Sequence, residues 1–156
     1  VINPNGSVFL LLSGGGASIV VADEVHARGY GAALGNYGEY SGNPNTEETY
    51  LYTKAVLGLL LASKAPQKVL IIGGAVANFT DIANTFAGVI QAIDEVAPEL
   101  AAQGVKVFVR RGGPRQEIGL AKIEAALARH GLLGAVHDPK TPLTAVVAEA
   151  LEGIRS

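Results

Sequence analysis

The sequence of 156 residues contains no cysteine, no methionine and no tryptophan. Without cysteine, neither a disulfide framework nor a thiolate zinc site can form, and the chain suits a reducing compartment. We therefore expect a cytoplasmic protein. Because the chain opens on Val1 and lacks an initiator methionine, we also expect it to be a fragment of a larger subunit.

The sequence also has no large excess of charge of one sign and no long apolar run. The 12 Lys and Arg residues against 14 Asp and Glu give a net charge of −2, with no basic stripe for nucleic acid. Even the apolar stretch "YLYTKAVLGLLLASKA" is interrupted by Lys54, and no run reaches the roughly 18 residues of a membrane span. The composition therefore predicts a chain that binds neither nucleic acid nor membranes.

Short apolar runs alternate with longer segments of helical period. Apolar residues at consecutive positions predict strands at 7–12, 68–74, 105–111 and 132–137. Such runs are typical of a parallel sheet with helices on both faces. Helices are expected near 46–63, 80–100, 116–130 and 141–154, with a further one after "SGGGAS". The pattern predicts one domain over 1–156, a flavodoxin-like doubly wound parallel sheet of about five strands.

In such sheets ligands bind beyond the carboxyl ends of the strands. Those ends are the segments "SGGGAS", "NYGEYSG", "GGAVANFT" and "RRGGP", and residues 36–45 are predicted to be a loop. "SGGGAS" is not a dinucleotide fingerprint, because Ile19 stands where the third glycine is required. The three histidines show no metal-ligand spacing, so each is expected at a surface or a helix end.

"GGAVANFT" passes from a strand to a helix through two glycines. The free backbone N–H groups at such a helix start suit an anion. Asn78 and Thr80 can cap the helix and also donate to an oxyanion, although capping by itself explains both residues. Asp81 in the first turn opposes an anion unless its side chain points away. Both interpretations remain open from the residues alone.

"VRRGGP" places two arginines at a strand end, beside glycines. Because successive strand residues face opposite ways, only one of Arg110 and Arg111 is expected to enter a given cleft. A guanidinium fork suits a di- or tricarboxylate, and the alternative is a pair of ion-paired surface arginines. Four clustered tyrosines can line a pocket, lie in an interface or pack in the core: Tyr37, Tyr40, Tyr50 and Tyr52.

"GGGAS", "NYGEYSG", "KVLIIGGAVANFTD" and "VFVRRGGP", in this order and at these separations, closely resemble ATP-citrate lyase. The match is to the domain after the ATP-grasp module of that enzyme and of the similar citryl-CoA synthetase. This domain is related to the carboxyl-terminal domain of the succinyl-CoA synthetase β subunit. The resemblance covers about 9–151.

The resemblance implies a citrate-binding, phosphohistidine-stabilising role in making citryl-CoA. Carried over by position, citrate contacts are Gly42, Asn78, Thr80 and Arg111, and a "power helix" that stabilises phosphate starts at Asn78, Phe79 and Thr80. No histidine of this chain is assigned as the phosphohistidine, so no catalytic residue is expected here. No cofactor or metal is expected in the chain itself, whereas the complete enzyme uses ATP, Mg and CoA.

The implied partners are citrate and the remaining parts of the enzyme, which are ATP-grasp, CoA-binding and citrate-synthase-like, in a hetero-oligomer. Alone, the chain is expected to be inactive. One departure is Val96, which stands where animal relatives have a citrate-contacting tyrosine. Two alternatives remain: a succinyl-CoA synthetase-like ligase for another carboxylate, which "GEYSG" and "RRGGP" oppose, and a non-catalytic assembly module.

Overall fold

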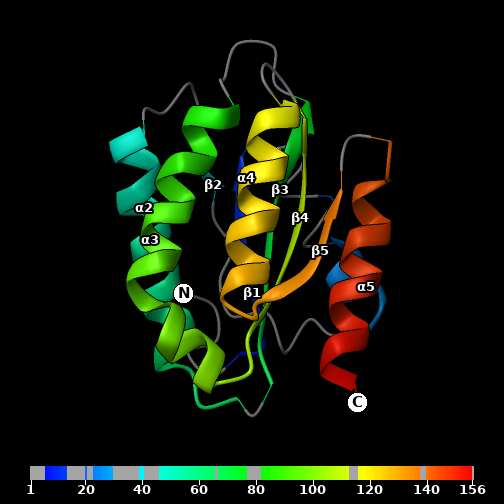
Figure 1. Ribbon diagram of the computed structural model, residues 1–156. Coiled ribbons are helices and arrows are strands. Elements are labelled where there is room, and N and C mark those ends of the chain that lie inside the picture. Colours follow the sequence, from blue (N-terminus) through cyan, green and yellow to red (C-terminus); the bar gives the residue numbers. More distant parts are fainter. Residues whose placement is uncertain are drawn as a thin grey trace.

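A parallel sheet of five strands forms the centre of the structure, a computed structural model of the chain (Figure 1). It describes residues 6–13, 20, 23–29, 39–40, 46–65, 67–76, 82–112, 116–137 and 140–155, with some side chains at element ends excepted. The strands are β1 (Val8–Ser13), β2 (Glu39–Tyr40), β3 (Val69–Val76), β4 (Lys106–Gly112) and β5 (Leu133–His137). Their order across the sheet is β2-β1-β3-β4-β5, and every pair is parallel.

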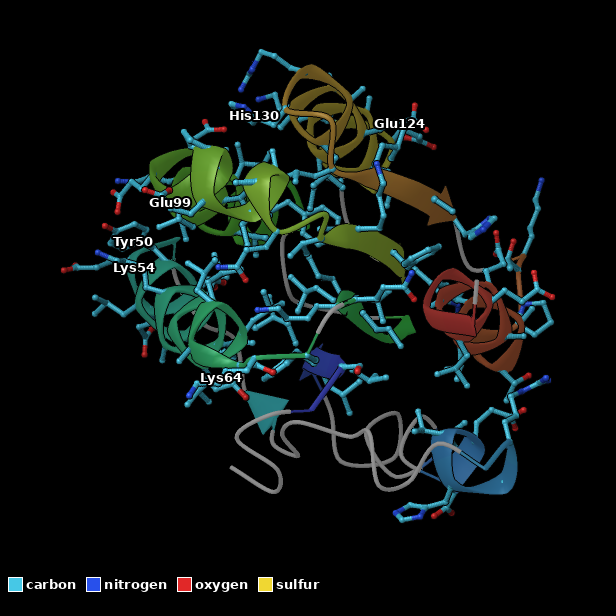
Figure 2. All side chains as sticks on the ribbon, turned by 90° about the horizontal axis from the view of Figure 1, so that it is seen from below. Tyr50, Lys54, Lys64, Glu99, Glu124 and His130 are labelled. Atoms are coloured by element: carbon cyan, nitrogen blue, oxygen red, sulfur yellow. The ribbon has the colours of Figure 1, made fainter. Side chains whose placement is uncertain are left out.

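Helices cover both faces of this sheet. Figure 2, which views the fold from below, shows α2 (Thr46–Ala62), α3 (Ile82–Ala102) and α4 (Gln116–Arg129) in one layer. On the other face lie α5 (Leu143–Arg155) and a helical segment at 23–27. Strand order and layering together confirm the predicted flavodoxin-like doubly wound sheet.

Two apolar cores form because strand side chains alternate between the faces. Phe9, Leu70 and Val109 belong to the larger core, under α2, α3 and α4. Leu10 and Phe108 belong to the smaller core, which α5 completes with Val146 and Val147. Each central strand thus contributes to both cores, which explains the uninterrupted apolar runs in the sequence.

Glycine ends two of the helices in the same way. After α4, Gly131 has a φ of 74°, its N–H donates to the Ala128 carbonyl, and the Leu132 N–H donates to the Leu127 carbonyl. This is a Schellman motif, in which a left-handed glycine satisfies carbonyls that the helix leaves open. Gly104 repeats the arrangement after α3, with a φ of 70°.

The predicted strands and helices occur within one or two residues at most of their ends. The loop predicted over 36–45 is wrong at Glu39–Tyr40, where two residues pair in parallel with Leu12 and Ser13. A strand of two residues is too short to show an alternating pattern in the sequence. It can be recognised only from its pairing with β1 in the folded sheet. The last helix begins at Leu143, two residues after the start expected at 141. No helix in the described part of the chain is long and apolar enough to span a membrane.

Candidate functional site

The carboxyl ends of β1, β3 and β4 lie side by side at the upper edge of the sheet (Figure 1). Ser13 of β1 is in register with Gly74 of β3, and Val76 of β3 is in register with Gly112 of β4. The register of β3 and β4 shifts between Gly73 and Val76. β2 lies on one side of β1, and β3 lies on the other, so the order in which strands are added changes side between β1 and β3. Doubly wound folds bind ligands at this position.

Most of the predicted site residues lie outside the described residues. Gly42, Asn78, Phe79 and Thr80 are outside, so their predicted roles stay predictions. Arg111 is described as a backbone position in β4, without its side chain. The described part of α3 begins at Ile82, just after the predicted helix start. The sheet thus places the carboxyl ends of β3 and β4 side by side. The predicted helix start follows β3 in the sequence, and Arg111 belongs to β4.

Arg110 turns toward α5, on the smaller core's face of the sheet. Its Nε donates to the Thr141 carbonyl oxygen at 3.0 Å, and the side chain is half-buried. Phe108, two residues earlier, belongs to the same face. Arg110 thus contacts the segment before α5. The prediction that only one of the two arginines enters a given cleft stays a prediction, since the Arg111 side chain lies outside the described part of the chain.

His137 ends β5 inside a polar cluster at the same edge of the sheet. Its Nε2 lies 2.7 Å from Glu149 Oε1, and its Nδ1 lies 3.3 Å from Thr141 Oγ1. Its strand neighbour is Arg110, with which it is in register. The sequence predicts only an isolated surface or helix-end histidine at this position. No sequence signal links it to Arg110 and Glu149, because the sheet alone brings them together.

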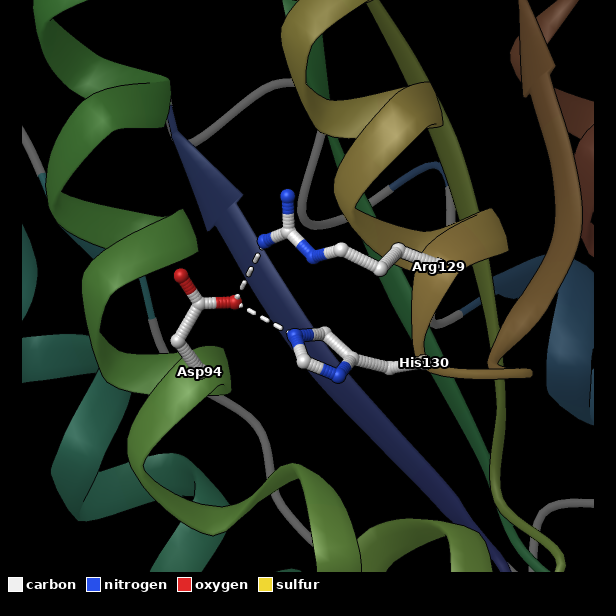
Figure 3. Close-up of polar contacts among 3 residues, drawn as sticks. All are labelled: Asp94, Arg129 and His130. Carbon is white, nitrogen blue, oxygen red and sulfur yellow. Dashed lines mark hydrogen bonds and ion pairs between the residues drawn. The ribbon is translucent and has the colours of Figure 1, made fainter.

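A second histidine cluster lies at the opposite edge, between α3 and the end of α4. Figure 3 shows Asp94 accepting from both His130 and Arg129. The Asp94 Oδ1 oxygen lies 2.7 Å from His130 Nε2 and 3.3 Å from Arg129 Nη2. His130 is thus a helix-end histidine, as predicted. Its position near the amino ends of the strands separates it from the candidate site.

Tyr50, Lys54 and Glu95 form a surface network between α2 and α3. The Tyr50 hydroxyl donates to Glu95, with oxygen distances of 2.6 and 2.8 Å, and Lys54 Nζ lies 3.3 Å from Glu95. The bond to Glu95 raises the pKa of Tyr50, and the same bond lowers the pKa of Glu95. Tyr50 and Tyr52 both pack against the larger core, which supports core packing for these two; Figure 2 places Tyr50 and Lys54 on the outside of α2.

Lys68 is a buried cation for which the sequence carries no signal. Only 3% of it is exposed, and its Nζ donates to the carbonyls of Leu60 at 2.8 Å and Ser63 at 2.6 Å. It also donates to Gln103 Oε1. Burial lowers the pKa of Lys68. Since these contacts lie at the carboxyl end of α2, Lys68 holds that helix end and stands apart from the candidate site.

Val96 is half-buried on α3 and packs against the larger core. It follows Ile82 by fourteen helical positions, which corresponds to about 21 Å along the helix axis. Among the described residues, no group of three or more His, Asp or Glu side chains is arranged to hold a metal ion.

Comparison with known proteins assigns the chain to a family. Residues 1–153 match the family model described as ATP citrate lyase citrate-binding. ATP-citrate synthase alpha chain protein 2 of Oryza sativa subsp. japonica is 42% identical over 153 residues, covering 97% of this chain and 36% of that protein. ATP-citrate synthase of Homo sapiens is 41% identical over 152 residues, covering 97% and 14%. The chain thus spans about a third of the rice relative and about a seventh of the human one.

Solved structures agree. The structure of ATP citrate lyase from Methanothrix soehngenii in complex with citrate and coenzyme A has a TM-score of 0.94 at 48% identity, covering 97% of this chain and 40% of that one. A Pyrococcus horikoshii protein with a TM-score of 0.55 at 19% identity shares the fold alone. The class is thus a doubly wound α/β domain. The chain belongs to the ATP citrate lyase citrate-binding family.

Proposed function

We propose that the chain is the citrate-binding and phosphohistidine-stabilising part of an ATP-dependent citrate:CoA ligase of the ATP-citrate lyase type. The observation that carries the proposal is the family match over 1–153. The Methanothrix relative, whose structure holds citrate and coenzyme A, supports it through the close agreement of the folds. The complete enzyme would use ATP, Mg and CoA, in the cytoplasm, as a hetero-oligomer of this domain with the other parts.

The proposed citrate contacts are Gly42, Asn78, Thr80 and Arg111, gathered beyond the carboxyl ends of the strands. Arg111 belongs to the carboxyl end of β4. Val107 and Val109 of this strand face the layer of α2 and α3, whereas Arg110 faces α5. A guanidinium at position 111 can form paired hydrogen bonds with a carboxylate.

The amino end of α3 supplies the second half of the proposed site. A helix of 21 residues presents free N–H groups and a partial positive charge at its start, and both favour an anion. In the proposed reaction, a histidine elsewhere in the enzyme receives the phosphoryl group from ATP and passes it to a citrate carboxylate. The CoA thiol then displaces phosphate to give citryl-CoA. The helix start at Asn78, Phe79 and Thr80 would stabilise the transferring charge.

Calorimetric titration of the 156-residue chain with citrate tests this function. We expect saturable citrate binding, none with succinate, and a loss of at least about tenfold in affinity for Arg111→Ala, since one charged contact disappears. Arg129→Ala is the matched control, because Arg129 is an exposed ion-paired arginine at the opposite edge. Equal binding of succinate would favour a ligase for another carboxylate. An absence of citrate binding that persists after the ATP-grasp and phosphohistidine parts are added would leave only an assembly module.

A further inference from the structure

We propose that His137 and Thr141 are positioning residues for the citrate site, which hold the end of β4 and with it the backbone position of Arg111. The proposal rests on the citrate-binding function proposed above. It concerns the polar cluster of Arg110, His137, Thr141 and Glu149, which no part of that function has used. We call this cluster the β4–β5 clamp.

The clamp is a closed circuit of contacts. Thr141 accepts from Arg110 Nε through its carbonyl oxygen at 3.0 Å, and its hydroxyl lies 3.3 Å from His137 Nδ1. His137 and Arg110 are in turn cross-strand neighbours in the ladder between β5 and β4. Two strands and the segment before α5 are therefore tied at one point. A closed circuit restricts the orientation of each member more than a single contact does.

Glu149 sets the direction of the hydrogen bonds. Its carboxylate can only accept, so the Nε2 nitrogen of His137, at 2.7 Å, carries a proton and donates it. In the neutral ring Nδ1 then accepts from the Thr141 hydroxyl. The carbonyl of Thr141 remains the acceptor for Arg110. Each donor in the circuit thus has an acceptor, and α5, which carries Glu149, is fixed against the end of β5.

Holding Arg110 constrains the position that follows it. Residue 111 is the next backbone position of β4, so a fixed Arg110 restricts the movement of the backbone that carries residue 111. The pairing of β4 with β3 is irregular near the end of β4, because the register shifts between Gly73 and Val76. The clamp holds the end of β4 from its other neighbour, β5. A preorganised arginine lowers the ordering cost of binding a carboxylate.

His130 provides a matched control for a histidine that only stabilises the fold. Its Nε2 also lies 2.7 Å from a carboxylate oxygen, that of Asp94, and its side chain is 25% exposed against 28% for His137. It sits at the opposite edge of the sheet (Figure 3). Removing either imidazole therefore breaks a similar hydrogen bond to a carboxylate, while only one removal affects the clamp.

The experiment measures citrate affinity by calorimetry and the melting temperature of the full 156-residue chain for five variants. His137→Ala and Thr141→Val should raise the citrate Kd about tenfold, the usual cost of losing a residue that orients a ligand-binding group. Thr141→Ser keeps the hydroxyl and should keep the wild-type Kd. His130→Ala should lower the melting temperature about as much as His137→Ala and leave the Kd unchanged. Arg111→Ala reports on the citrate site itself.

The results that would overturn the clamp alone differ from the result that would overturn the proposed function. If the wild-type chain binds citrate and Arg111→Ala does not, yet Thr141→Val and His137→Ala bind like wild type, the clamp is wrong and the citrate site stands. The clamp is equally wrong if His130→Ala weakens binding as much as His137→Ala. If the wild type does not bind citrate, or Arg111→Ala binds as tightly as the wild type, the proposed function fails and the clamp fails with it. Thr141→Val is nearly isosteric, so it keeps the test valid should His137→Ala not fold.

Discussion

Replacing Lys68 with methionine tests whether a buried cation holds the lower end of the fold. Methionine keeps the apolar stem and removes the ammonium group, which donates to Leu60, Ser63 and Gln103. Three hydrogen bonds from a charged donor contribute about 1.5–3 kcal/mol each. Burying the ammonium costs several kcal/mol, which the substitution recovers. We therefore expect a net loss of about 2–4 kcal/mol in the free energy of unfolding, because the acceptors stay buried without their donor.

The assay is urea unfolding followed by circular dichroism, with thermal melting as a second measurement. For a chain of this length the loss corresponds to a fall of roughly 5–15 °C in melting temperature. Lys106→Met is the matched control, since Lys106 Nζ also donates to a carbonyl at a helix end, that of Gly131 at 3.0 Å, but from an exposed position. Its loss should stay below about 1 kcal/mol. Equal effects of the two substitutions, or a Lys68→Met chain as stable as wild type, would refute the reasoning.

The pH dependence of the same pair gives an independent check. Burial lowers the pKa of Lys68 below its usual 10.5, so as the pH approaches that value the folded chain binds fewer protons at this group than the unfolded chain. Stability from the group then rises with pH. The stability difference between wild type and Lys68→Met should therefore widen from neutral pH toward 10.5, and a constant or shrinking difference would contradict the burial argument.

Two further predictions concern glycines and the surface network. A Cβ at Gly134 would lie 2.6 Å from the Phe108 ring, so Gly134→Ala should lower the free energy of chemical unfolding by about 1–3 kcal/mol. Gly58 has an open position within α2, so Gly58→Ala should stabilise the chain by about 0.5–1 kcal/mol. Equal effects would contradict the packing at Phe108. Glu95→Gln removes the carboxylate that raises the pKa of Tyr50, so ultraviolet titration should show one tyrosine ionising at lower pH, a change that Tyr50→Phe abolishes. An unchanged titration would mean that the bond does not persist in solution.

The fold was predictable because its signals are local. Each central strand is a short apolar run, and Gly104 and Gly131 end helices through left-handed backbone that other residues rarely adopt. What escaped prediction depends on partners distant in sequence. Lys68 is buried because helix-end carbonyls of α2 and a side chain after α3 converge on it. Nothing in the local sequence distinguishes it from Lys106, which is exposed.

The candidate site shows the same division on a smaller scale. Alternation along β4 required that Arg110 and Arg111 separate, but it did not say which one faces the helix layer of α3. The face on which each arginine lies depends on which β4 residues point into the larger core and which into the smaller one. The contact of Arg110 with Thr141 shows that Arg110 lies on the α5 face. Arg110 is therefore held on the α5 side of the sheet, and a citrate contact of Arg111 stays the proposal that the family resemblance implies. The clamp that holds Arg110 could not be found from sequence, because only the folded sheet brings His137 and Glu149 to it.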